Sequence, residues 1–364
     1  MKLLIQPGDG VERLVKGIRK AKKSVEIMIF RFDRPEIERA LVDAVERGLF
    51  VHALIAFTNR GGEQVLRKLE MRFLESGITV ARTAGDLVRY HGKMLVVDRK
   101  ELYVLSFNFT HLDIDRSRGF GIITRNQKLV AEAVKLFEAD TKRQSYTAGN
   151  NKFLVSPVNA RKELAHFIKG AKKDLLIYDP KISDRVMLRL LEERKKAGVE
   201  VRVVGSASGK RLGACELKRM RLHTRTIIRD HSSAFVGSQS LRQLELDARR
   251  EIGVIIRDAS AVKQLVRTFE EDWSSAAAEQ MEEQRRKEQM KPRRVAKKIA
   301  KSMSKKGQLG PVARKMAKAL AAATKVDLKN KKVHETVRNL VKSAVEETAV
   351  DAAKEAVRAV GKAG

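Results

Sequence analysis

A histidine followed two positions later by a cationic residue occurs twice in this chain of 364 residues, and the residues that follow also match. In each copy four residues separate the cation from an aspartate, and a serine and a further polar residue come later at the same spacing. The matched residues are His91, Lys93, Asp98, Ser106 and Asn108 in the first copy and His223, Arg225, Asp230, Ser238 and Ser240 in the second. Histidine changes protonation state near neutral pH, so each copy could supply a nucleophile or a proton donor beside a fixed positive charge. One such motif is a weak signal, whereas its recurrence at identical spacing is a strong one.

The surrounding sequence is also duplicated. In each copy an apolar run precedes a helical pattern that ends at a glycine, Gly48 or Gly198, where a helix C′ glycine belongs. A second β-type run follows, so each copy predicts a parallel strand–helix–strand unit. Later apolar runs predict further strands, which are expected at 94–97, 102–105, 121–124, 226–228, 234–236 and 253–256. A closing helix is expected in each copy, and residues 141–155 are interpreted as a linker.

Length and composition set the frame for this duplication. We expect a first domain at 1–145, a second at 146–276 and a tail at 277–364, because the chain is too long for one ordinary core. Hydrophobic residues make up 43% of the chain, which is enough for α/β cores. The single cysteine, Cys215, excludes an internal disulfide. Neither a secretory signal nor an apolar run long enough to span a membrane is evident, so a cytoplasmic protein is expected.

Positive charge dominates the chain, with a formal net charge of +31. Such an excess attracts polyanions such as nucleic acid or anionic lipid, although a solvated surface has the same composition. The segment 291–332 holds 15 lysines and arginines against one acidic residue, Asp327. Apolar residues four positions apart predict short cationic helices in the tail, separated near Gly307 and Gly310. These helices could pack on the protein, or they could bind an anionic membrane surface or nucleic acid.

The motif pair resembles the signature of the phospholipase D superfamily, H-x-K-x4-D-x6-G-S-x-N present twice. The resemblance covers roughly the first 275 residues. It implies two tandem α/β sandwich domains related by pseudo-two-fold symmetry, with both histidines meeting at the interface where a phosphate binds. It also implies that no metal or other cofactor is needed and that a monomer is sufficient for a complete site.

Phosphodiester chemistry suits these residue types. A nucleophile must attack phosphorus, the leaving alkoxide needs a proton, and fixed positive charge must stabilise the equatorial oxygens. The resemblance favours His91 as the nucleophile that becomes a phosphohistidine and His223 as the general acid. Lys93 and Arg225 are then expected to hold the phosphate oxygens. The serines and Asn108 are expected to add neutral hydrogen bonds to the phosphate, those serines being Ser106, Ser238 and Ser240. Asp98 and Asp230 are interpreted as turn residues with a structural role.

The sequence departs from the signature at several positions. Arg225 replaces a lysine, Ser240 an asparagine and Leu105 a glycine. Family members also place a carboxylate on a later strand to orient each histidine. Glu251 fits that place and is assigned to His223, whereas the matching position in the first copy is Gly119. Asp113 or Asp115 could substitute there, although the sequence does not show it.

Three functions remain open on this basis. The favoured one is a phosphodiesterase or transphosphatidylase acting on a phospholipid, including transfer of the cardiolipin synthase type. The second is a nuclease or DNA-processing enzyme on the same scaffold, which the positive charge supports. The third is a polyanion-binding protein with a decayed site, which the departures from the signature support.

Overall fold

The computed structural model describes residues 1–58, 63–208 and 212–305, together with 339 and 343, and for 286–305 it describes the backbone alone. Residues 1–277 form one compact unit, and a second unit comprises 278–364. The boundary near residue 145 lies inside the first unit, so division of that unit into two domains at this point stays a prediction.

The first half of the compact unit is built on a mixed sheet with the strand order β1-β8-β7-β6-β2-β3-β4. Its strands are β1 (Lys2–Gln6), β8 (Ser117–Thr124), β7 (Glu101–Leu105), β6 (Met94–Val97), β2 (Ser24–Ile29), β3 (Phe50–Ile55) and β4 (Thr79–Arg82). Strands β2, β3 and β4 run parallel, as the strand–helix–strand prediction requires, and the other neighbours pair antiparallel.

The second half repeats this order as β9-β17-β15-β14-β10-β11-β12. Its strands are β9 (Phe153–Val155), β17 (Ile252–Ile256), β15 (Ser233–Gly237), β14 (Arg225–Arg229), β10 (Asp174–Ile182), β11 (Glu200–Ala207) and β12 (Ala214–Cys215). The parallel and antiparallel pairings also recur in the same places. The predicted tandem α/β architecture is therefore confirmed.

Each sheet ends in an edge strand that the sequence analysis did not predict. Strand β1 pairs with β8, and β9 pairs with β17. The expected linker at 141–155 is therefore wrong at its end, because Phe153–Val155 joins the sheet. Three residues are too few to show an alternating pattern, which explains why periodicity missed this strand.

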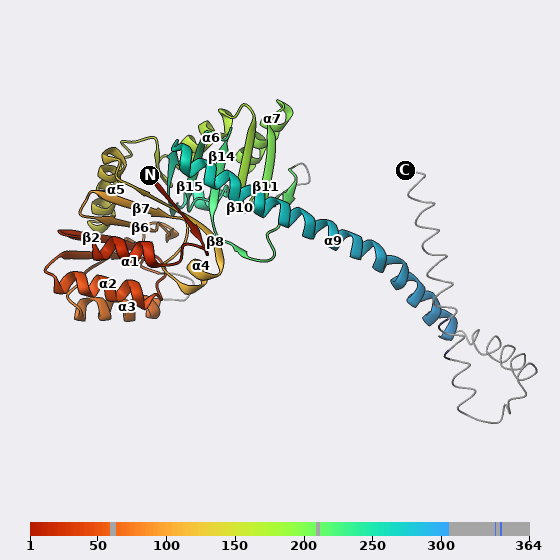
Figure 1. Cartoon of the computed structure of the whole chain (residues 1–364), viewed down its shortest axis with the longest axis horizontal. Coiled ribbons are helices and arrows are strands. Elements are labelled where there is room, and N and C mark those ends of the chain that lie inside the picture. Colours follow the sequence, from red (N-terminus) through yellow and green to blue (C-terminus); the bar gives the residue numbers. More distant parts are fainter. Residues whose placement is uncertain (59–62, 209–211, 306–338, 340–342, 344–364) are drawn as a thin grey trace, which may run out of the picture. The chain divides into compact units, whose positions relative to one another are not determined.

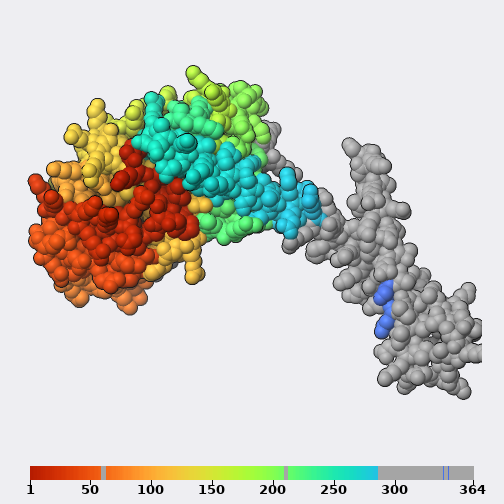
Figure 2. All heavy atoms as spheres, viewed as in Figure 1, coloured from red at the N-terminus to blue at the C-terminus, as the bar shows by residue number. Residues whose placement is uncertain are grey.

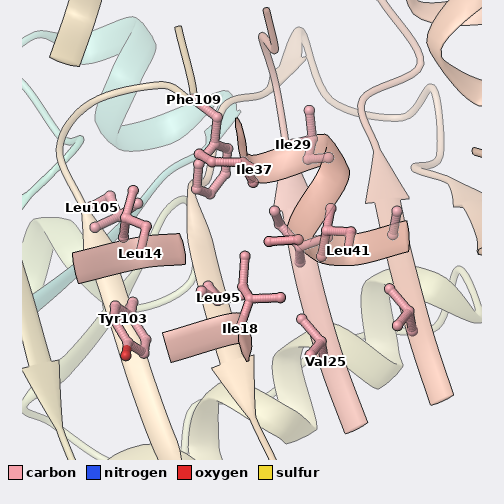
Figure 3. Close-up of a cluster of buried hydrophobic side chains, with 14 of the residues drawn as sticks. Leu14, Ile18, Val25, Ile29, Ile37, Leu41, Leu95, Tyr103, Leu105 and Phe109 are labelled. Carbon is pink, nitrogen blue, oxygen red and sulfur yellow. The ribbon is translucent and has the colours of Figure 1, made fainter. Parts of the chain in front are cut away.

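Helices cover the outer face of each sheet (Figure 1). On the first sheet these are α1 (Glu12–Arg19), α2 (Pro35–Glu46) and α3 (Glu63–Glu75). Leu14 and Ile18 of α1 and Leu41 of α2 point onto the strands, where they meet Val25 and Leu95 (Figure 3). The second sheet carries α6 (Ala160–Lys169), α7 (Arg185–Lys196) and α8 (Gln243–Asp247). The glycines that end α2 and α7, Gly48 and Gly198, have φ angles of 81° and 85°, as expected for a C′ glycine.

A third hydrophobic core joins the two halves. It includes Met94 and Phe120 from the first sheet and Tyr178 and Val254 from the second. Helices α5 (Gln127–Thr141) and α9 (Ala259–Lys305) also contribute to it. Burial of apolar surface from both sheets in one core makes the halves a single cooperative body.

Two ion pairs cross between the halves at symmetry-related positions. Arg118 of the first half donates to Asp272 of the second at 2.7 and 2.9 Å. Arg250 of the second half pairs with Asp140 of the first at 3.1 Å. All four side chains are largely buried, so removal of either partner leaves a charge without compensation.

Helix α9 differs from the predicted arrangement of a closing helix followed by separate short tail helices. It runs unbroken from Ala259 to Lys305, through the predicted boundary after residue 276. The segment 274–291 contains neither glycine nor proline and is rich in strong helix formers such as alanine, glutamate and lysine. The predicted tail helices beyond Lys305 lie outside the described residues.

Each motif aspartate stabilises one turn of its own half by accepting backbone hydrogen bonds. Asp98 Oδ1 accepts the backbone N–H groups of Lys22, Lys23 and Ser24 at 2.7–3.1 Å. Asp230 Oδ1 does the same with residues 172–174. Both aspartates have φ angles in the left-handed region, 54° and 53°. Burial raises the pKa of each carboxyl, but the backbone hydrogen bonds outweigh it and leave each pKa below its ordinary value.

We therefore expect Asp98→Ala and Asp230→Ala each to lower the free energy of unfolding by about 2 kcal/mol at neutral pH, because three N–H groups lose their acceptor. Asp98→Asn, which keeps one acceptor oxygen, should lose less. Because the folded-state pKa is depressed, this stabilisation is present above the ordinary aspartate pKa and is lost as the pH falls through the folded-state value. Urea unfolding at several pH values measures both effects, with exposed Glu46→Ala as the control. Equal midpoints for Asp98→Ala and the unsubstituted protein would contradict the structural role.

Candidate active site

Each motif histidine follows a short strand that pairs with a strand of the opposite half. Strand β5 (Arg89–Tyr90) pairs with β16 (Arg249–Arg250), and the backbone N–H of His91 donates to the carbonyl of Arg250 at 2.7 Å. Strand β13 (Arg221–Leu222) pairs with the start of β8, and the N–H of His223 donates to the carbonyl of Arg118 at 3.0 Å. Each histidine is therefore held by the opposite half of the unit.

Both motif cations make the same contact. Lys93 Nζ donates to the carbonyl of His91 at 2.6 Å, and Arg225 Nη1 donates to the carbonyl of His223 at 2.6 Å. Arg225 thus takes the place of the expected lysine. Burial lowers the pKa of Lys93 to about 7. The charges of Lys93 and Arg225 both lower the pKa of both histidines, which brings the four side chains into one electrostatic cluster.

Glu251 holds His91, and its predicted assignment to His223 is wrong. Its Oε2 lies 2.8 Å from His91 Nδ1. The alignment placed Glu251 in the same copy as His223, but β16 carries it across to the first half next to His91. Burial raises the pKa of Glu251 to about 7, against the opposing effect of Lys93.

Asp113 lies beside His223, and not beside His91 as a substitute for the missing first-copy carboxylate. Its Oδ2 lies 3.5 Å from His223 Nε2, and its Oδ1 accepts from Arg221 at 2.5 Å. Burial raises the pKa of Asp113, but His223 and Arg221 outweigh it and lower the pKa overall. Asp115, the other residue considered, instead pairs with Arg34 at 2.5 Å.

The position equivalent to Glu251 is Gly119, and an aromatic ring occupies the space of its side chain. A Cβ at Gly119 would lie 2.9 Å from the ring of Phe107. His223 Nδ1 is buried and has no hydrogen-bond partner in the described part of the chain. The two histidines are therefore held differently, one through Nδ1 by Glu251 and the other near Nε2 by Asp113.

Burial governs the protonation of both rings. His91 and His223 are 8% and 6% exposed, and burial is the largest cause that lowers both pKa values well below the ordinary histidine value. Burial thus favours the neutral form of both rings. A neutral His91 that donates from Nδ1 to Glu251 leaves its Nε2 lone pair available for attack, which is the orientation that a nucleophile needs.

The motif serines bridge neighbouring strands. Ser106 Oγ accepts the N–H of Phe120 at 2.9 Å, and Ser238 Oγ accepts the N–H of Ile252 at 3.1 Å. Both serines are fully buried. These contacts assign them a structural function, and direct contact with a phosphate stays a prediction.

Asn108 and Ser240 hold carboxylates. Asn108 Nδ2 donates to Asp113 Oδ2 at 2.6 Å, and Ser240 Oγ donates to Asp179. The N–H of Ser240 donates to Glu245 at 2.9 Å, as that of Asn108 does to Asp113 at 2.8 Å. Their predicted contact with phosphate also stays a prediction.

Glu245 is a member of the site that the sequence analysis did not name, and it is the counterpart of Asp113. Each stands five residues after the last polar residue of its motif, Ser240 or Asn108, so continued comparison of the two copies would have found the pair. Glu245 is 1% exposed and raises the pKa of His91, although burial and the neighbouring cations outweigh this effect. A carboxylate thus faces each histidine from the opposite half.

No three histidine, cysteine, aspartate or glutamate side chains gather into a metal-binding group within the described ranges. Likewise, no helix within them is long and apolar enough to cross a membrane. Independence from metal stays a prediction.

The crossed carboxylates predict specific changes in the nuclear magnetic resonance signals of the histidine rings. In protein labelled with ¹⁵N at histidine, Glu251→Gln should shift the ring nitrogens of His91 far more than those of His223. Asp113→Asn should do the reverse, because each substitution removes the charge beside one ring. His91→Gln and His223→Gln assign the signals. A larger response of His223 to Glu251→Gln would restore the pairing predicted from the sequence.

Relatives of known name match part of the chain. Mitochondrial cardiolipin hydrolase of Danio rerio is 29% identical over 131 residues, which is 35% of this chain and 56% of that protein. The Mus musculus protein of the same name is 30% identical over 134 residues, which is 36% of this chain and 57% of that protein. The chain thus spans about half the length of the curated relatives that it matches.

Solved structures share the fold over a larger part of the chain. Polyphosphate kinase from Porphyromonas gingivalis matches with a TM-score of 0.63 and 17% identity, covering 74% of this chain and 50% of that one. Phosphatidylserine synthase from Haemophilus influenzae Rd KW20 matches with a TM-score of 0.58 and 12% identity, covering 74% and 85%. At these identities the likeness establishes the fold alone.

The family model described as cardiolipin synthase, PLD-like domain, matches twice, over residues 14–141 and 164–273. The two matches cover both halves of the compact unit, including both histidine motifs and Glu251. Together they account for more than half of the chain, which therefore belongs to the phospholipase D superfamily.

Proposed function

We propose that the protein is a phosphodiesterase of the phospholipase D type that works through a phosphohistidine. The observation that carries the proposal is the buried cluster in which each half supplies one histidine, one cation and at least one carboxylate. Two histidines can divide nucleophilic attack and proton transfer between them, and two cations can hold the anionic phosphate. Arg225 Nε is buried and has no hydrogen-bond partner among the described residues, and the nearest carboxylate oxygen given for it, Glu245 Oε2, lies 3.9 Å away, so Nε can donate to a phosphate oxygen.

In the first step, Nε2 of His91 attacks phosphorus while the bond from phosphorus to the leaving oxygen breaks. Protonated His223 gives its proton to that oxygen, so the departing alcohol is neutral. In the second step, His223 takes a proton from water or another alcohol, whose oxygen attacks phosphorus and releases His91. Asp113 and the bound phosphate anion favour the protonated form of His223, which burial alone disfavours.

The assignment of His91 as nucleophile now has a basis different from the sequence argument. From the sequence, Glu251 was expected to orient His223. The 2.8 Å contact instead places Glu251 on Nδ1 of His91, which orients the ring and supports the positive charge that develops upon attack. His223 remains the candidate acid, with Asp113 near its Nε2.

Single-turnover kinetics with bis(4-nitrophenyl) phosphate test these two functions. His91→Ala should lower the rate by at least about 10³-fold and abolish the phosphoenzyme, because the nucleophile is lost. His223→Ala should still release one nitrophenolate per chain, because this leaving group needs no proton, but should then turn over about 10²-fold more slowly. Exposed His166→Ala is the matched control. A phosphoenzyme in His91→Ala that is absent from His223→Ala would reverse the assignment.

A phospholipid is the substrate class we favour, with water or another alcohol as acceptor. The family model and the names of the curated relatives refer to cardiolipin, which supports a lipid phosphodiester. A nuclease remains the second candidate, because the net charge of +31 suits a nucleic acid backbone equally well. A polyanion-binding protein without catalysis remains the third, because Gly119 replaces the carboxylate that would face His223.

Parallel assays distinguish these candidates. Full-length protein is incubated with vesicles containing cardiolipin or phosphatidylglycerol and separately with plasmid and single-stranded DNA, all in the presence of EDTA. We expect headgroup release that His91→Ala abolishes and, when ethanol is added, a phosphatidylethanol product. DNA cleavage without lipid turnover would replace the phospholipid proposal with the nuclease. Salt-sensitive binding without turnover of either substrate would indicate a decayed site.

Cytoplasmic location, with peripheral contact to the membrane through residues 291–332, is also a proposal. Its support is the cationic composition of that segment, which suits either anionic lipid or nucleic acid. Fractionation of cells that express the full-length protein and the protein without residues 291–364 measures both features.

A further inference from the structure

A basic hollow of about 880 Å³ lies in the first half, between α1 and the edge of the first sheet. Its floor is formed by Gly17, Val97, Tyr103 and Ile123. Its charged lining consists of Lys2, Arg13, Lys16, Lys20, Lys22, Asp98, Lys100, Glu101 and Arg125. Figure 2 shows the red N-terminal segment, which includes α1, at the surface of the first half.

The hollow is separate from the histidine cluster. Strand β6 begins at Met94, next to Lys93 of the site, and ends at Val97, which lines the hollow. The two places therefore lie at opposite ends of the same strand. Nothing in the proposed phosphodiesterase reaction uses the hollow.

Positive charge in the hollow is largely uncompensated. The lining holds two carboxylates against seven cationic side chains. Asp98 accepts backbone N–H groups of residues 22–24 and interacts electrostatically with Lys100, and Glu101 pairs with Arg125 at 2.6 Å. Arg13 contacts Asp9 at 3.4 Å. In the described part of the chain, five lysines of the lining have no carboxylate within ion-pair distance, and these are Lys2, Lys16, Lys20, Lys22 and Lys100. Ammonium groups gathered around a concave surface repel one another and attract a multivalent anion.

The second half fills the equivalent space. By the alignment of the two copies, Gly17 corresponds to Phe167 and Val97 to Arg229. The Phe167 ring lies 4.4 Å from the Arg229 guanidinium, and Arg229 Nη1 donates to the Phe167 carbonyl at 3.1 Å. A Cβ at Gly17 would lie only 2.2 Å from Tyr103 Oη, so glycine is what keeps α1 close to Tyr103 and leaves the space open.

The charges of the lining are also specific to the first half. Arg13, Lys20 and Lys100 correspond to Glu163, Gly170 and Ser232 in the second copy. The second half adopts the same fold without this open space and without these cations. The fold alone therefore does not explain why the first half has both.

We propose that this hollow is a binding site for a compact, soluble anion that carries several phosphate groups. The lysines come from α1, from β1 and from the turns at residues 20–23 and 98–100, so they surround a small ligand from several sides. A concave site of this kind suits clustered phosphates better than a flat membrane or a long nucleic acid strand.

Lysine footprinting on the full-length protein tests the proposal at the site itself, with tripolyphosphate as the probe. Acetylation is followed by mass spectrometry with and without the probe, at about 0.15 M salt so that diffuse attraction is screened. We expect protection of Lys16, Lys20 and Lys100 at concentrations that leave Lys169 and Lys172 of the second half reactive. Equal protection in both halves would indicate charge attraction alone and overturn the proposal.

Variants test the same site by affinity. Lys16→Ala/Lys20→Ala should weaken tripolyphosphate binding by at least about tenfold in calorimetry. Lys169→Ala/Lys172→Ala removes two lysines from the corresponding helix and turn of the second half and should leave the affinity within about twofold. Gly17→Phe combined with Tyr103→Phe makes the first half resemble the second and should abolish protection of Lys16, with circular dichroism as the folding control. If phosphatidylglycerol vesicles or single-stranded DNA protect these lysines from acetylation and tripolyphosphate does not, the proposal of a compact ligand is overturned.

Discussion

The pairing of each histidine segment with a backbone segment from the opposite half is the constraint on which the site depends. Two short parallel ladders, β5 with β16 and β13 with β8, fix the backbone N–H groups of His91 and His223 on carbonyls of the other half. The Arg118–Asp272 and Arg250–Asp140 ion pairs secure the same crossings with buried charge. Neither half contains a complete acid–base arrangement without this pairing. The shared core and the shared site therefore form together.

Burial is the second determinant of the chemistry. The histidines, Lys93 and Glu251 are all nearly inaccessible, and in each case burial is the largest cause of the pKa shift, always towards the neutral form. A phosphate anion that enters the cluster adds negative charge and favours the protonated forms of Lys93 and His223. In the proposed reaction, the substrate therefore helps to establish the protonation states that its cleavage requires.

Comparison of the two sequence copies was sufficient to predict the duplicated architecture and to identify both motif histidines. The spacing of residues within a strand–turn–strand segment is the same in both copies even where the residues differ. The same comparison assigned Glu251 to the wrong histidine. Position in the sequence indicates which residues belong to the same copy. The pairing of β16 with β5 is a tertiary contact, and no local sequence pattern predicts it. Strand β9 was missed because Phe153–Val155 is too short for periodicity, and α9 passed the predicted boundary because its helix formers continue beyond Trp273. Asp113 could not be placed beside His223 before the fold was known.

The contact between Gly119 and Phe107 has a consequence for how this sequence can change. A carboxylate at residue 119 would restore matching partners for both rings, yet any side chain there meets the Phe107 ring at 2.9 Å from its first carbon. The symmetric arrangement thus needs two coordinated substitutions. A smaller residue at 107 must precede or accompany the carboxylate at 119. A smaller residue at 107 alone leaves a cavity in the core, and an acid at 119 alone is overpacked. The present asymmetry is therefore separated from the symmetric alternative by intermediates of lower stability, and single-residue drift will tend to preserve it.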